Sequence, residues 1–64
     1  MPTLSHREVE VLLLIGKGFS DKEIATQLKI SSRTVQTHVS RILVKLSAKN
    51  RSNAVFAYFN PNMN

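Results

Sequence analysis

Apolar residues recur at helical spacing along most of the chain. The clearest case is Val35, Val39 and Ile42, which follow one another at i, i+4 and i+7 and continue to Leu46. This spacing places them on one side of an α-helix and leaves polar side chains on the other. The same periodicity defines four segments, namely residues 6–17, 21–28, 32–46 and 51–59. No segment shows the alternation typical of a strand, so the pattern predicts an all-α fold of four helices.

Serine residues mark the starts of the first two helices. Glu8 follows Ser5 by three residues, and Glu23 follows Ser20 by three residues. Each pair predicts a capping box, in which each side chain accepts a hydrogen bond from the other residue's backbone N–H. Gly18 favours the left-handed backbone conformation that ends the first helix.

The second and third helices are joined by a tight turn. We expect Ser31 to cap the third helix and Ile30 to pack into the core. Lys29 stands where such a turn favours a positive φ, so glycine or asparagine should be tolerated there. Asn50 is the expected N-cap of the fourth helix, and the chain ends in a polar tail over residues 60–64.

The helical phase also predicts which side chains form the core. In the first helix Val9 and Leu13 lie opposite the inner face and should point outward. In the fourth helix Phe56 and Phe59 should also point outward. The residues expected in the core are Val11, Leu12, Ile15, Ile24, Ala25, Leu28, Val35, Val39, Ile42, Leu43, Leu46, Ala54, Val55, Ala57 and Tyr58.

The size and composition restrict the chain to one small domain. It has 64 residues, of which 42% are hydrophobic. That suffices for a single core, so we expect one domain over residues 1–64. Cysteine is absent, and no apolar run approaches the roughly 20 residues of a membrane span. The expected protein is therefore cytoplasmic, without a membrane partner or a disulfide.

Charge is distributed unevenly along the chain. Residues 1–23 carry three basic and four acidic side chains, whereas residues 24–64 carry six basic side chains and no acidic one. A basic block of this kind is typical of a surface that binds a polyanion, although a solvated basic face gives the same composition. Two helices joined by a tight turn can place the second helix in the major groove of DNA.

The sequence gives little support for a catalytic site or a metal-binding site. The acids are few and stand mostly at helix starts, and no glycine-rich phosphate loop or serine-histidine-aspartate set is present. His6 and His38 lack the spacing of metal ligands. We expect no enzyme activity, no metal and no cofactor, and we expect His38 to pack at the edge of the apolar stripe with one ring nitrogen bonded to the backbone or to a phosphate.

Taken in order, these residues resemble the LuxR/FixJ-type helix-turn-helix domain of bacterial response regulators and quorum-sensing activators. The resemblance covers residues 4–58. It rests on Leu4-Ser5, Arg7-Glu8, Glu10-Val11-Leu12, Gly18, Ser20, Glu23-Ile24-Ala25, Leu28, Ile30-Ser31, Thr34-Val35, His38, Ile42, Lys45-Leu46, Arg51 and Ala54-Val55. It implies a four-helix helix-turn-helix bundle that binds double-stranded DNA sequence-specifically and regulates transcription, with the third helix as the recognition helix.

Three positions depart from the family pattern. Gln36 stands where the family commonly has lysine, which concerns base preference. Val44 stands at a position that is often basic, which concerns affinity. Asn53 replaces an acid that would complete a capping box with Asn50, which concerns local stability only.

The outer face of the third helix supplies candidates for DNA contacts. Phosphate contacts fix position, and contacts to base edges give sequence choice. The base-reading candidates are Gln36, Thr37, Ser40 and Arg41, and the phosphate-binding candidates are Lys22, Arg33, Thr34, Lys45 and Arg51. Each has an alternative interpretation, as a solvated charge or as a residue that only starts a helix.

Apolar side chains that face outward suggest protein partners. Members of the resembling family commonly dimerise through the last helix, and the corresponding candidates are Val55, Phe56 and Phe59. The alternative function is a truncated interaction module that pairs with a full-length regulator or with RNA polymerase. The sequence is compatible with a domain from a larger regulator and with a stand-alone protein. Finally, the inward phase of Glu8 suggests a buried ion pair, for which Arg51 is the hypothesised partner.

Overall fold

The computed structural model describes residues 3–60, and within that range it contains four α-helices. They are α1 (His6–Gly16), α2 (Asp21–Leu28), α3 (Ser32–Lys45) and α4 (Arg51–Phe59). The predicted all-α fold and its four segments are confirmed. α1 and α3 each end one residue earlier than predicted, because Lys17 and Leu46 are the C-caps. The predicted tail beyond Asn60 lies outside the described residues.

The helix starts follow the expected capping pattern. Ser5 Oγ accepts from Glu8 N at 3.2 Å, and Glu8 Oε1 accepts from Ser5 N at 2.8 Å. The second capping box, between Ser20 and Glu23, has the same two distances. Each such cap contributes about 1 kcal/mol to helix stability. The two caps add to the stability that α1 and α2 gain from packing against the core.

The other two helices are also capped, and each of the three connections between helices contains a residue with positive φ. Ser31 and Asn50 cap α3 and α4 as expected. Gly18 has φ of 92° and Lys29 has φ of 59°, which confirms both predicted left-handed positions, and Ser47 adds one that the sequence did not indicate. Asn53 accepts a hydrogen bond from the backbone N–H of Lys49, outside α4.

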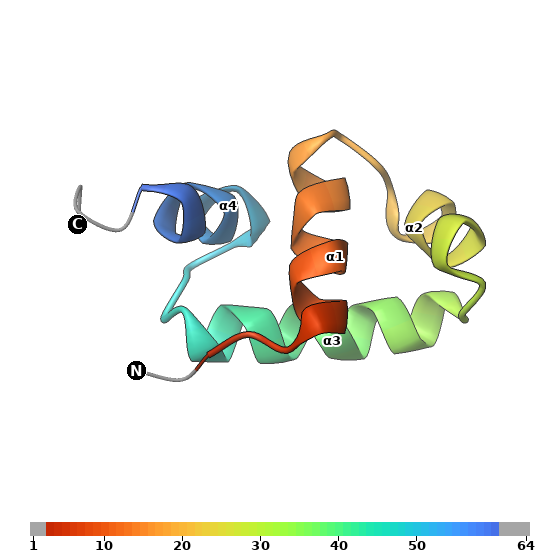
Figure 1. The fold of residues 1–64 in the computed structure, drawn as a ribbon, viewed down its shortest axis with the longest axis horizontal. Helices are drawn as coiled ribbons and strands as arrows, with labels where there is room; N and C mark the ends of the chain where they lie inside the picture. The colour runs from red at the N-terminus through yellow and green to blue at the C-terminus, as the bar shows by residue number, and fades with distance from the viewer. Residues whose placement is uncertain (1–2, 61–64) are drawn as a thin grey trace.

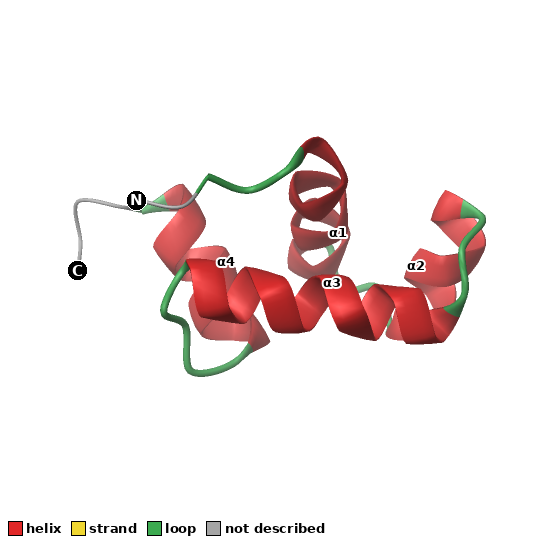
Figure 2. Cartoon of the chain, turned by 90° about the horizontal axis from the view of Figure 1, so that it is seen from below, coloured by secondary structure: helices red, strands yellow, loops and turns green. Residues whose placement is uncertain are grey.

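The helices are arranged around α3, which is the longest. In Figure 1 α3 runs along the bottom of the molecule, α1 stands over its middle, and α2 and α4 lie on either side of α1. α1 contacts the other three helices, and α3 also contacts all of them. Seen from below in Figure 2, α3 lies in front of α1, α2 and α4. One long side of α3 is therefore left uncovered.

The core lies between α1 and α3 and is closed by α2 and α4. Its most deeply buried side chains are Val11, Leu12, Ile24, Val35 and Ile42. Two core predictions were wrong. Tyr58 is exposed, because the last turn of α4 extends past the core, and Val9 is half-buried against the core, because α1 has neighbours on several sides.

Candidate nucleic-acid interface

The uncovered side of α3 carries the four predicted base-reading residues and Val44. Val35, Val39 and Ile42 are buried toward the core. The exposed side chains opposite them are Gln36, Thr37, Ser40, Arg41 and Val44. The predicted orientation of α3 is thus confirmed: its polar side faces solvent along the whole helix. We refer to these five side chains as the α3 outer face.

Thr37 is held in a defined rotamer on this face. Its hydroxyl donates to the backbone carbonyl of Arg33 at 3.2 Å. That hydrogen bond uses the only donor of the side chain, so the γ-methyl group and the oxygen lone pairs remain for an outside contact. A methyl-to-methyl contact with thymine is compatible with this rotamer, whereas donation to a base edge is not.

The N-terminal end of α3 offers groups suited to a phosphate. Arg33 and Thr34 lie in its first turn and are exposed. The unpaired N–H groups and the positive dipole end of a helix start also favour an anion. The Thr34 hydroxyl lies 2.8 Å from the Ser31 hydroxyl, and Thr34 N donates to the same oxygen. Lys22, in the first turn of α2, is exposed as well.

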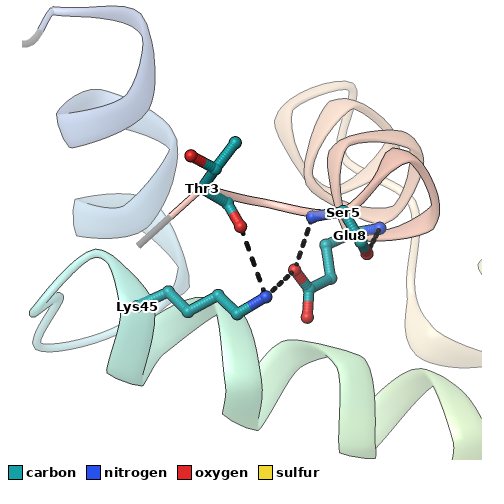
Figure 3. A network of polar contacts seen from close by, with 4 residues as sticks. All are labelled: Thr3, Ser5, Glu8 and Lys45. Carbon is teal, nitrogen blue, oxygen red and sulfur yellow. Dashed lines mark hydrogen bonds and ion pairs between the residues drawn. The ribbon is translucent and has the colours of Figure 1, made fainter. Parts of the chain in front are cut away.

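Lys45 at the other end of α3 is engaged inside the protein. Figure 3 shows its side chain extending to Glu8 on α1, where Nζ donates to Oε1 at 2.7 Å and to the Thr3 carbonyl oxygen at 3.4 Å. Glu8 is only 3% exposed. The hydrogen bond from Lys45 is the main reason why the pKa of the Glu8 carboxyl lies below its ordinary value. The hypothesised pair between Glu8 and Arg51 is therefore wrong.

Arg51 pairs with Asp21 instead. Two guanidinium nitrogens donate to the two carboxylate oxygens at 2.5 and 2.8 Å, which joins the start of α4 to the start of α2. This bidentate arrangement lowers the pKa of Asp21 and raises the pKa of Arg51. Arg51 cannot reach Glu8 as well, because its fork already lies against Asp21.

These two ion pairs reduce the number of basic side chains in the second half of the chain that are free to bind a polyanion. Two acidic residues of the first half are each neutralised by a cation of the second half. Lys45 and Arg51 therefore hold the fold together, while Arg33 and Arg41 remain exposed. The sequence could not identify the pairs, because the partners are 37 and 30 residues apart. Only the inward phase of Glu8 signalled that a cation was needed.

The predicted partner surface of α4 is exposed in part. Phe56 and Phe59 are 44% and 49% exposed, and the Phe59 ring meets Tyr58 edge to face. Val55 is half-buried and packs toward Gly16 of α1. His38 is half-buried too, but its Nδ1 has no hydrogen-bond partner among the described residues, so the expected backbone bond is not found at that nitrogen.

Comparison with known proteins identifies clear relatives. Residues 2–57 match the family described as "Bacterial regulatory proteins, luxR family". The response regulator proteins VraR of Staphylococcus aureus and Staphylococcus saprophyticus are 50% identical over 60 residues. That alignment covers 94% of this chain and 29% of each relative, so the chain spans less than a third of their length.

A solved structure shares the fold. It is the crystal structure of the response regulator ChrA, described as part of a heme-sensing two-component system. The match covers the whole of this chain and 32% of that one, with a TM-score of 0.89 and 36% sequence identity. Both kinds of relative are response regulators, and both are longer than this chain.

Proposed function

This chain belongs to the luxR family of bacterial regulatory proteins, and from that premise we propose that it binds specific sequences of double-stranded DNA through the α3 outer face. At the level of the family it is a DNA-binding domain of transcription regulators. The observation that carries the proposal is the exposure of Gln36, Thr37, Ser40 and Arg41 on the one long side of α3 that no other helix covers.

Each base-reading residue has a defined task. Gln36 offers an amide that can pair with adenine N6 and N7, whereas lysine at this position would favour guanine. Thr37 presents its methyl group to thymine. Arg41 is long enough to reach guanine O6 and N7, and Ser40 serves either partner of a base pair. A good bidentate contact gives about 1–3 kcal/mol of discrimination between bases.

Phosphate contacts flank the base contacts. Lys22, Arg33 and Thr34 bind the backbone near the start of α3. Lys45 and Arg51 keep 31% and 40% of their side-chain surface exposed, so they contact phosphate only through N–H groups that Glu8 and Asp21 do not use. They contribute less to DNA affinity than Arg33 does, because their charges are already neutralised in part.

A selection experiment tests this function. The purified chain is mixed with random duplexes, and the bound fraction is amplified and sequenced. We expect one enriched motif, and a binding constant that falls steeply between 50 and 200 mM salt, on the order of tenfold or more for each three phosphates contacted. Recovery of unselected sequences at every salt concentration would contradict the proposal.

A homodimer on DNA is the expected form of binding. One domain of this size reads a short half-site, and two domains related by symmetry double the contact. Phe56 and Phe59 supply exposed aromatic surface for that contact, with Val55 at its edge.

The same surface supports the alternative function, an interaction module for a full-length regulator or RNA polymerase. A chain of this second kind would have no use for the α3 outer face. Retention on duplex DNA at moderate salt therefore distinguishes the two functions.

A further inference from the structure

Val44 is an apolar side chain at the C-terminal end of the otherwise polar α3 outer face. It is 79% exposed, the highest value among the exposed large hydrophobic side chains of residues 3–60. A single exposed apolar residue is common on protein surfaces, so the position of Val44 on the α3 outer face is the informative observation. It lies in the last turn of α3, one residue before Lys45, and not in a loop.

The helical phase places Val44 at the centre of the α3 outer face. Counting about 100° per residue from Gln36, Ser40 lies at about 40°, Val44 at about 80° and Thr37 at about 100°. Val44 therefore stands in line with Thr37 and Ser40. Its distance along the helix axis from Thr37 is about 10 Å, since each residue rises 1.5 Å.

The surroundings of Val44 lack the charge that a phosphate contact needs. A shallow hollow of about 280 Å³ is lined by Ser40, Arg41, Val44 and Lys45. The Lys45 ammonium is turned away to Glu8 and Thr3, so this residue presents its carbon chain. Arg41 is the one cation left at the hollow. A phosphate beside Val44 would lose hydration against carbon, and its one cationic partner at the hollow would be Arg41, which is a base-reading candidate.

We propose that Val44 is a specificity-determining residue that reads the C5-methyl group of a thymine. Thymine carries the only apolar group on the base edges of the major groove, and apolar side chains are its usual contacts. The inference rests on the proposed function, because it requires the α3 outer face to lie in that groove. The thymine should differ from the base that Thr37 contacts, because about 10 Å along the helix axis separates the two side chains.

Replacement of thymine by uracil tests the contact, because uracil lacks only the methyl group. Each thymine of the selected duplex is replaced in turn, and binding of the whole chain is measured at fixed salt. At one position we expect about fourfold weaker binding by the unmodified chain, the loss that one buried methyl group predicts. V44A should bind the thymine and uracil duplexes equally well at that position.

Two further variants separate this contact from other effects. T37A should keep the Val44-dependent thymine and lose sensitivity at a different one, which serves as the matched control. V44K should bind all sequences more tightly, with a salt dependence steeper by about one released ion, and should lose the distinction between thymine and uracil. Both positions are exposed, so the three variants should fold as the original chain does.

The outcomes are distinguishable. Selective duplex binding without any thymine whose methyl effect disappears in V44A overturns the role of Val44 and leaves the proposed function intact. Equal weakening of every duplex by V44A likewise overturns it. Absence of selective duplex binding by the unmodified chain overturns both proposals.

Discussion

Removal of the Lys45 side-chain charge should destabilise the domain strongly. The Glu8 carboxylate is 3% exposed, and Lys45 is the cation that pairs with it. In K45M the carboxylate keeps only its capping bond from Ser5 N. Breaking a buried pair from one side costs about 3–5 kcal/mol. Because Lys45 itself is 31% exposed, we expect less than this range, about 2–3 kcal/mol, which is a large part of the stability of a 64-residue domain.

The lowered pKa of Glu8 determines how the stability of the domain should change with pH. The pKa of Glu8 is lowered in the folded state, mainly by Lys45. The unfolded chain therefore binds the proton more readily, and the stability that this group contributes is complete above its unfolded pKa, about 4.3. It is lost as the pH falls through the folded pKa. In K45M burial without a partner should raise the pKa of Glu8, so acid should weaken this variant less.

Urea unfolding followed by circular dichroism measures the effect at pH 7 and at steps down to pH 3. The difference between the original chain and K45M should be largest at pH 7 and should shrink as Glu8 is protonated. The double variant E8Q/K45M should regain more than half of the loss, because glutamine keeps an acceptor for Ser5 N and carries no charge. K49M, at an exposed lysine, should change stability by less than about 0.5 kcal/mol. A loss in K45M no larger than in K49M, or one independent of pH, would refute the reasoning.

Three further predictions follow from single positions. K29G should stabilise the domain by about 0.5–1 kcal/mol in urea unfolding, because Lys29 has φ of 59°; a loss of stability would show that the lysine side chain contributes there. Q36A should weaken binding to the selected duplex about tenfold and leave an unrelated duplex within twofold, measured by titration; equal losses on both would count against base reading. The double variant F56S/F59S should bind one half-site normally but lose cooperative binding to two, in a gel-shift titration; unchanged cooperativity would place the dimer contact elsewhere.

The helices could be predicted closely because their determinants are local. A serine and a glutamate three residues apart specify a helix start without reference to the rest of the chain. The same holds for Lys29, whose left-handed backbone follows from its place in a tight turn between two helices. The predicted C-terminal ends of α1 and α3 were one residue too late. Lys17 and Leu46 are C-caps, but their backbone N–H groups still donate hydrogen bonds to carbonyl oxygens of the helices that they end.

The errors concern which helix lies beside which. Periodicity gives the phase of a side chain but not how much of the helix surface its neighbours cover. α1 touches three helices, so Val9 is covered although it lies away from the main stripe. Most side chains of the last turn of α4 are exposed, and Tyr58 is one of them. The hypothesised partner of Glu8 was wrong for the same reason: the second half of the chain holds six cations, and packing places Lys45 beside Glu8.

The α3 outer face could be predicted because one helix carries all of it, but its charge could not. Sequence counting assigns six cations to the second half of the chain, as if all were available to a polyanion. The fold directs Lys45 toward Glu8 and Arg51 toward Asp21. The exposed positive charge that can bind phosphate is therefore concentrated at the start of α3, around Arg33. Toward the other end, Arg41 lies beside the apolar side chain of Val44. A helix whose charge is graded in this way has one end that binds phosphate strongly and another end that depends on the shape and chemistry of the bases.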